Sequence, residues 1–299
     1  MLNFIKLSLN DIRKIKPYFL FSTNKTCDNT VGGTFMWRDY FSVEYAEYNE
    51  TLVFKVKLQY YNAITAFTLP LGKDVYGCIK EIEKYCYIHE IPIAFCTVTK
   101  EEIPYITSIF NNNQLHYEND WNDYIYKSDD LKTLTGTKYK SQRNHINYFQ
   151  KTYNTYLFEE ITEKNINEVK EFNNSLYSNV TKNSDIFVEE QKKTVEVLDN
   201  YCIYGLIGGI LRLNGSIVAF SIGEICNDVL FIHIEKADIK YKGVYQMINY
   251  EFANHFASDK IKYINREEDV GDEGLRFSKQ SYHPCDIIKK YIILRQVTF

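Results

Sequence analysis

Apolar positions recur with two different periods along the first half of the chain, which predicts a mixture of helices and short strands. The clearest helix is expected at residues 75–89, where Val75, Ile79, Ile82 and Cys86 recur at helical spacing. Two more helices are expected at residues 10–21 and 101–110, strands at 63–68, 92–98 and 123–126, and irregular structure at 29–40. This half is therefore expected to form a domain of its own.

The second half follows a different order of elements. A strand at residues 155–161, helices at 163–178 and 185–200, and a pair of strands at 203–211 and 217–225 come first. Asn214-Gly215 between the two apolar arms is a strong local signal of a β-hairpin. The remaining expected elements are a strand at 229–235, a helix from Gly243 to about residue 256, a strand at 262–265, a helix at 272–280 and a strand at 287–294. This order predicts an α+β fold.

The sharpest change in charge lies between residues 131 and 158, where five basic side chains and no acidic ones occur. A polar connector is expected over residues 127–137, and a basic helix after it. We therefore predict an N-terminal domain over residues 1–130, a basic connector helix over 131–153 and a C-terminal domain over 154–299. A chain of 299 residues has room for two domains of this size.

Composition narrows the class of protein. Hydrophobic residues make up 45% of the chain and charged residues 25%, as is typical of globular proteins, and the net charge of −4 gives no general reason to bind nucleic acid or anionic lipid. The seven scattered cysteines form no C-x-x-C pair and fit reduced thiols in a cytoplasmic protein. No signal peptide is expected, and the apolar stretch at residues 201–226 is not expected to span a membrane because Arg212, Asn214 and Gly215 interrupt it.

The turn at residues 240–246 separates a predicted strand from a predicted helix. Backbone N–H groups at such a helix start favour an anion such as a phosphate, and a glycine allows close approach of a ligand. The expected ligand-binding residues are Lys242, Gly243, Val244, Tyr245 and Gln246. A tight turn without a ligand explains the glycine equally well.

A dense polar stretch follows the strand expected at residues 262–265. Loops that follow strands often carry functional groups. We expect a partly buried, hydrogen-bonded network of charges here, because unpaired buried charge is costly. Its members are Asn265, Arg266, Glu267 and Asp269, lining or bracing a cleft, with Arg276 and Lys279 facing them from the next helix. The spacing matches neither a calcium loop nor a zinc site, so no metal is expected, and a solvated acidic turn is the alternative.

A third candidate is the helix that begins near residue 138. Lys140, Asn144 and Asn147 share one face of it, and Arg143 lies beside that face. We expect Lys140, Arg143 and Asn144 to contact a phosphate-rich ligand. The alternative is an exposed linker helix. The packing positions of this helix are expected at Tyr139, Ile146 and Phe149.

The strand at residues 230–236 offers acid–base chemistry. Strand alternation puts Phe231, His233 and Glu235 on one face. Transfer to an amine needs a base that takes the amine proton and a donor that protonates the leaving group. We expect Glu235 to be the base with His233 beside it, and Tyr245 or Tyr282 to be the acid. A half-exposed strand with ordinary polar residues is the alternative.

Three segments together resemble one known family: KSQRNHINYF at residues 140–149, FIHIEKAD…KGVYQMINYEFA at 231–253, and NREEDVGDEGLRFSKQSYHP at 265–284. They resemble the family of the phosphatidylglycerol lysyltransferase C-terminal domain, across most of residues 124–294. The resemblance implies two tandem GNAT-like acyltransferase domains. GNAT enzymes bind the pyrophosphate of acyl-CoA at a turn placed like that of Gly243, usually with two glycines where this chain has one. Characterised relatives transfer an amino acid from aminoacyl-tRNA to a lipid head group.

These observations predict transfer of an acyl or aminoacyl group to an amine or hydroxyl acceptor. Direct attack is expected, because the chain has no G-x-S-x-G motif and no evident Cys–His pair. The donor expected from the resemblance is acyl-CoA or aminoacyl-tRNA, with no tightly bound cofactor, and the acceptor is a small molecule or a lipid head group. The alternative is a non-catalytic module of the same fold that holds an anionic ligand or a protein partner, and the single glycine favours it.

Overall fold

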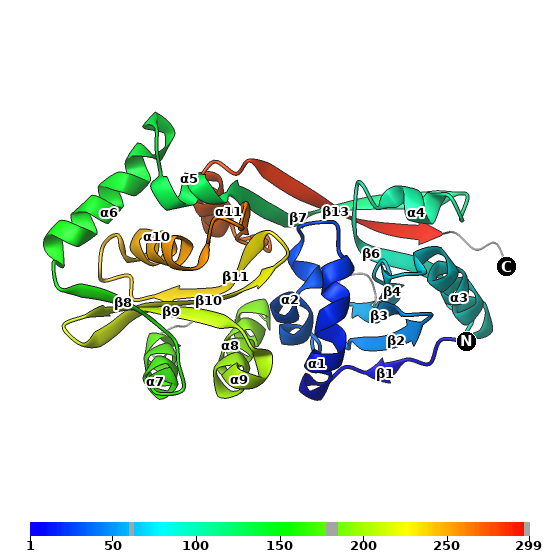
Figure 1. Cartoon of the computed structure of the whole chain (residues 1–299). Coiled ribbons are helices and arrows are strands. Elements are labelled where there is room, and N and C mark those ends of the chain that lie inside the picture. Colours follow the sequence, from blue (N-terminus) through cyan, green and yellow to red (C-terminus); the bar gives the residue numbers. More distant parts are fainter. Residues whose placement is uncertain (60–62, 178–184, 296–299) are drawn as a thin grey trace. The chain divides into compact units, whose positions relative to one another are not determined.

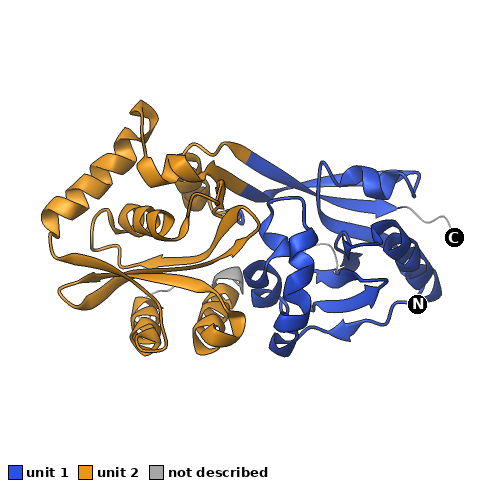
Figure 2. Cartoon of the chain, viewed as in Figure 1, with its two compact units in different colours: residues 1–123, 268–271, 287–299 blue, residues 124–267, 272–286 orange. Residues whose placement is uncertain are grey.

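The computed structural model describes residues 1–59, 63–177 and 185–295 and divides the chain into two compact units (Figures 1 and 2). Unit 1 comprises Met1–Asp123, Glu268–Gly271 and Ile287–Phe299, and unit 2 comprises Tyr124–Glu267 and Asp272–Asp286. Each unit therefore draws on more than one stretch of the sequence. This division differs from the expected one, which kept residues 154–299 together as a single domain.

Unit 1 contains a mostly antiparallel sheet with the strand order β1-β2-β3-β4-β6-β13, in which only β4 and β6 are parallel. Its strands are β1 (Ile5–Lys6), β2 (Glu44–Tyr48), β3 (Thr51–Leu58), β4 (Ile64–Phe67), β6 (Ile93–Thr99) and β13 (Asp286–Arg295), and β5 (Leu71–Gly72) pairs with β3. The α-helices are α1 (Ile12–Ile15), α2 (Val31–Met36), α3 (Val75–Ile88) and α4 (Ile103–Thr107).

Helix α3 agrees with the periodicity of its sequence. The Asp74 side chain caps its start by accepting a hydrogen bond from the Gly77 N–H, and Cys78, Ile79 and Ile82 are fully buried. Helix α2 was not expected, because residues 29–40 contain two adjacent glycines. Burial of its apolar side chains, Phe35 among them, outweighs the weak helix propensity of glycine.

Unit 2 is built on sheet strands in the order β7-β12-β11-β10-β9-β8 (Figure 1). Its strands are the end of β7 (Asn113–Lys127), β8 (Tyr156–Glu160), β9 (Ile207–Leu213), β10 (Ser216–Cys226), β11 (Val229–Ala237) and β12 (Tyr263–Asn265). The helices are α5 (Ser128–Thr133), α6 (Lys140–Thr152), α7 (Ile166–Tyr177), α8 (Asp185–Asp199), α9 (Tyr201–Tyr204), α10 (Val244–Phe256) and α11 (Glu273–Gln280). Helix α10 covers one face of this sheet, and α7 and α8 cover the other (Figure 1).

The core of unit 2 lies between α10 and the sheet. Met247 and Phe252 of α10 pack with Leu230 and Ile232 of β11. Phe149 of α6 is fully buried in the same core. Helix α6 is therefore part of the packed body of unit 2, where the sequence predicted a separate connector.

The expected hairpin is confirmed at β9 and β10. Asn214 and Gly215 both have positive φ, +49° and +83°, which is the requirement of the tight turn that Asn-Gly favours. The apolar stretch at residues 201–226 thus forms a short helix and two strands. Among the described residues, no helix is long and apolar enough to cross a membrane.

Candidate active site in unit 2

Strands β11 and β12 run side by side for only three residues each. Val229–Phe231 pairs in parallel with Tyr263–Asn265, where β12 ends, whereas β11 continues to Ala237. The side chains that follow this pairing are charged: His233 and Glu235 on β11, and Arg266 and Glu267 in the loop after β12. The loop after β12 thus lies beside residues of β11 that come about 30 positions earlier in the sequence.

A β-bulge in β11 changes which of these groups share a face. Ile222 of β10 pairs with Ile234, but the next residue, Gly223, pairs with Ile232, so His233 has no partner in the register. Strand alternation is therefore interrupted at His233. The prediction that His233 and Glu235 point the same way is wrong for this reason.

Glu235 lies on the face of the sheet that α10 covers. Asn249 of α10 donates a hydrogen bond to Glu235 Oε2 at 3.3 Å, and Arg266 Nη2 lies 3.3 Å from Glu235 Oε1. The Arg266 guanidinium also stacks over the ring of Tyr282, 4.8 Å from its centre. Burial raises the pKa of Tyr282 far above its usual range, which makes its hydroxyl a reluctant proton donor.

His233 lies on the opposite face, between two carboxylates. Its Nδ1 is 2.6 Å from Glu267 Oε1, and its Nε2 is 2.9 Å from Glu224 Oε1. Burial by itself lowers the pKa of His233, but Glu267 and Glu224 outweigh burial and raise this pKa to about 10. His233 therefore remains an imidazolium near neutral pH and cannot accept a further proton. It fixes Glu267, whose backbone N–H is held by Asn265 Oδ1 at 2.6 Å.

The other residues predicted in the polar stretch have separate places. Lys279 of α11 is buried and donates to the carbonyl oxygen of Arg266 at 2.6 Å. Arg276 lies one turn earlier on α11 and is half-buried. Asp269 is fully buried in unit 1, where its Oδ1 accepts a hydrogen bond from the Gly271 N–H at 3.0 Å. Asn265, Arg266, Glu267 and Lys279 thus belong to unit 2 and Asp269 to unit 1.

The turn before α10 is closed by protein on one side. Gly243 has φ +88°, and a Cβ atom there would lie 2.5 Å from the carbonyl oxygen of His145 in α6. Val244 is buried in the core of unit 2, Lys242 Nζ lies 5.0 Å from the centre of the Tyr148 ring, and Gln246 is half-buried. Of the five residues expected to bind a ligand here, Lys242 and Tyr245 are exposed. Packing of α6 is sufficient reason for the glycine.

Some polar side chains of α6 bind other parts of the protein, and others are exposed to solvent. Tyr139, Ile146 and Phe149 are buried, as the sequence predicted. Arg143 Nη1 donates to the carbonyl oxygens of Leu134 and Gly136, and so closes the turn after α5. Lys140 and Asn144 are exposed. Arg143 is therefore already used by the protein, whereas Lys140 and Asn144 are free to meet a ligand.

Three polar residues at this site were missed from the sequence: Ser221, Glu224 and Asn249. Ser221 is fully buried directly opposite Glu235 in the pairing of β10 with β11. Glu224 was the one detectable signal, since it is an acidic residue in the otherwise uncharged, largely apolar strand β10. Ser221 and Asn249 are small polar residues within apolar segments, and no pattern separates such residues from packing positions.

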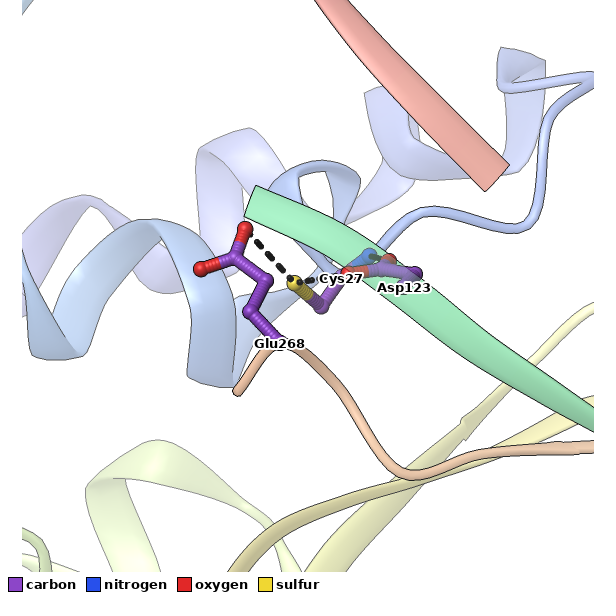
Figure 3. A group of neighbouring side chains, drawn as sticks. All are labelled: Cys27, Asp123 and Glu268. Carbon is purple, nitrogen blue, oxygen red and sulfur yellow. Dashed lines mark hydrogen bonds between the residues drawn. The ribbon is translucent and has the colours of Figure 1, made fainter. Parts of the chain in front are cut away.

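One group of potential metal ligands lies in the described part of unit 1 (Figure 3). One ligand atom each from Cys27, Asp123 and Glu268 lies within 4.8 Å of the others. Lys290 Nζ lies among them, 2.5 Å from Glu268 Oε1, 3.1 Å from Asp123 Oδ1 and 3.6 Å from Cys27 Sγ, and it is also 2.6 Å from Asp28. This ammonium already supplies the positive charge that a metal ion would bring, so we describe the group as a buried ion cluster.

Comparison with known proteins gives a consistent family assignment. The model of the family described as "Phosphatidylglycerol lysyltransferase, C-terminal" matches residues 21–294. A crystal structure of a conserved protein of unknown function from Bacteroides thetaiotaomicron VPI-5482 is 32% identical, with a TM-score of 0.88 over 99% of this chain and 100% of that one. An uncharacterized protein of Mycoplasmoides gallisepticum is 24% identical over 66% of this chain and 63% of its own length.

Two more distant structures share the fold. L-PGS from Bacillus licheniformis is 14% identical, with a TM-score of 0.66 over 95% of this chain and 91% of that one. FemX is 6% identical, with a TM-score of 0.62 over 97% of this chain and 96% of that one. The predicted α+β class is confirmed, and the chain shares the fold of L-PGS and FemX.

Proposed function

The chain belongs to the family of the phosphatidylglycerol lysyltransferase C-terminal domain, and from that premise we propose that it transfers an aminoacyl group from tRNA directly to an amine or hydroxyl acceptor. The observation that carries this proposal is the Glu235 carboxylate of unit 2, which Asn249 and Arg266 hold just beyond the paired residues of β11 and β12. The family is named after an enzyme that transfers lysine to a lipid head group, and a lipid or another small molecule with an amine or hydroxyl is the acceptor we propose.

The surroundings of Gly243 favour tRNA over acyl-CoA as the donor. The carbonyl oxygen of His145 lies where a Cβ of residue 243 would be, so α6 takes up the space on that side of the turn. The exposed face of α6 carries Lys140 and Asn144, and Lys151 follows near its end. Lysines along a helix suit the phosphates of a nucleic acid, which spread over many ångströms.

The proposed reaction forms one bond and breaks one. The acceptor nitrogen or oxygen attacks the carbonyl carbon of the aminoacyl ester, and Glu235 takes the proton of the acceptor. The ester C–O bond then breaks, and the Glu235 carboxyl returns this proton to the departing tRNA oxygen. Both contacts of Glu235 are long, at 3.3 Å, and leave lone pairs on its oxygens for that proton. His233 is not the base in this scheme, because its two carboxylate neighbours hold it as an imidazolium.

Turnover of charged tRNA tests the proposal. Total tRNA charged with a mixture of labelled amino acids is incubated with the purified chain and either phosphatidylglycerol vesicles or a set of small amines, and labelled product is followed. We expect product with the wild type and a loss of about 10²–10⁴-fold in rate for Glu235→Gln. Glu251→Gln is the matched control. Glu251 is also a glutamate of unit 2, in α10, but its carboxylate accepts a hydrogen bond from Tyr156 and has no role in the proposed reaction.

A non-catalytic binding module is the second candidate, and one observation favours it: each oxygen of Glu235 already has a protein partner. That candidate predicts salt-dependent binding of charged tRNA without consumption of the ester. Absence of product with every acceptor, together with measurable binding, would select it. Product formed from acetyl-CoA but not from charged tRNA would replace the donor in our proposal.

A further inference from the structure

We propose that Arg266 and Ser221 form the site that receives the carbonyl oxygen of the transferred group and stabilises its negative charge in the transition state. This inference rests on the proposed function, since it assigns a role within the same reaction. Arg266 and Ser221 act neither as a base nor as a nucleophile in this reaction. Their contribution is to direct hydrogen-bond donors at the reacting carbonyl.

The first observation is an unused donor on Arg266. Only 11% of its side chain is exposed, and Nη2 lies 3.3 Å from Glu235 Oε1. Nη1 is buried and has no hydrogen-bond partner among the described residues. A buried guanidinium N–H without an acceptor is costly, so a native structure keeps one only where something else accepts its hydrogen bond.

The second observation is an unused hydroxyl on Ser221. Its side chain is fully buried, and Oγ has no hydrogen-bond partner in the described part of the chain. Ser221 pairs directly with Glu235 across β10 and β11, ahead of the bulge at His233. Directly opposite residues of antiparallel strands place their Cβ atoms about 5 Å apart on the same face. Ser221 therefore neighbours Glu235 on one face of the sheet, and Arg266 contacts the Glu235 carboxylate.

Two unused donors beside one carboxylate indicate what fits between them. The missing partner has to be a hydrogen-bond acceptor, because Nη1 can only donate. A second carboxylate or a phosphate would be repelled by Glu235, whereas a neutral ester carbonyl would not. Attack on that carbonyl carbon turns its oxygen into an oxyanion, and donors in a buried site stabilise an oxyanion far more than they stabilise a neutral carbonyl.

In the proposed reaction the base and the two donors have separate roles. Glu235 takes the proton of the acceptor while Arg266 Nη1 and Ser221 Oγ hold the carbonyl oxygen. Collapse of the intermediate re-forms the C=O bond, breaks the ester C–O bond and releases the tRNA oxygen, which takes the proton from the Glu235 carboxyl. The negative charge on the carbonyl oxygen exists only briefly. Donors whose positions are already fixed by burial and by the contact with Glu235 can stabilise it without reorganisation.

Kinetics of two variants test the inference. Arg266→Lys keeps a positive charge beside Glu235 but loses the second N–H arm, and Ser221→Ala loses only the hydroxyl. We expect each to lower kcat for charged tRNA by about 10²-fold with little change in KM, as for removal of one oxyanion donor. We also expect guanidinium ion in the buffer to restore part of the turnover of Arg266→Ala and none of that of Glu235→Gln.

Matched controls separate this role from a structural one. Arg212→Lys alters an arginine of β9 that is fully paired with Glu159 and Glu168, and Ser216→Ala alters an exposed serine of β10. Both should retain wild-type kcat, and melting followed by circular dichroism verifies that each variant is folded. Folded Arg266→Lys and Ser221→Ala with wild-type kcat would overturn the inference while leaving the proposed function intact. A wild type without turnover would overturn the proposed function itself.

Discussion

His233 and Glu235 are two residues apart in β11, yet their side chains lie on opposite faces of the unit 2 sheet. The bulge at His233 interrupts strand alternation, so Glu235 meets Asn249 of α10 while His233 meets Glu224 and Glu267. The two faces thereby carry different chemistry. One holds the Glu235 carboxylate and the donors of Arg266 and Ser221, and the other holds the His233 imidazolium between two carboxylates.

The charge on His233 predicts a pH dependence of stability. Its pKa is raised from 6.5 to about 10 in the folded chain, so its stabilising effect is complete below about pH 6.5 and is lost as the pH rises through about 10. The free energy of unfolding of the wild type should therefore fall toward that of His233→Gln over this range, by at most about 1.4 kcal/mol per pH unit. Denaturant titrations at pH 6, 8 and 10 measure the difference. His255→Gln, which removes an exposed histidine paired with Glu160, should give a difference that barely changes.

The packing of α6 predicts that Gly243 matters for stability. Gly243→Ala places a Cβ 2.5 Å from the His145 carbonyl oxygen and also forces a positive φ on alanine. Gly215→Ala is the matched control, because Gly215 has a similar φ of +83° and open space around its Cβ position. We expect a loss of about 1 kcal/mol for Gly215→Ala from backbone strain alone and a clearly larger loss for Gly243→Ala. Equal melting temperatures of the two variants would contradict the role assigned to the contact with α6.

Lys290 is expected to hold the ion cluster of unit 1 together. Lys290→Met would leave the carboxylates of Asp28, Asp123 and Glu268 without that cation, which should cost about 3–5 kcal/mol of unfolding free energy at neutral pH. Lys84→Met removes an exposed ammonium whose partner Glu81 also pairs with the N-terminus, and it should change little.

The cost of Lys290→Met should shrink as the pH is lowered. Burial already raises the pKa of Glu268 to about 8 and raises that of Asp28, and removal of the ammonium raises both further. A carboxyl group with a raised folded pKa stabilises the fold when protonated and loses this effect as the pH rises through that pKa. Urea titrations at pH 5 and pH 8 check the sign, and a larger cost at pH 5 would contradict it.

The exposed lysines of α6 predict a salt dependence of tRNA binding. Each phosphate contact that is lost should lower the slope of log affinity against log salt by about 0.9. We therefore expect a shallower slope for the double variant Lys140→Ala/Lys151→Ala in filter binding of charged tRNA, with unchanged stability. Arg143→Ala should instead lower the melting temperature, because Arg143 holds the carbonyl oxygens of Leu134 and Gly136. An unchanged slope in the double variant would assign the tRNA contact to another surface.

Local patterns in the sequence were sufficient for most of the elements. The helix over Val75–Ile88 and the hairpin around Asn214 and Gly215 follow from side-chain periodicity and from the φ angles that Asn-Gly favours. The α+β class and the family also followed from the sequence, because both depend on the order of elements and on contiguous motifs. These properties involve residues that are near one another along the chain.

Tertiary structure alone decided the arrangement of the candidate site. Alternation predicted that His233 and Glu235 share a face, but the bulge between them depends on the register with β10, and register is a relationship between strands. Ser221 is a candidate because the pairing of β10 with β11 places it opposite Glu235 and its hydroxyl has no partner among the described residues. The space beside Gly243 is occupied by His145 of α6, about a hundred residues earlier in the sequence. The sequence by itself determined which polar residues were present, and the long-range pairing of strands and helices decided which of them meet.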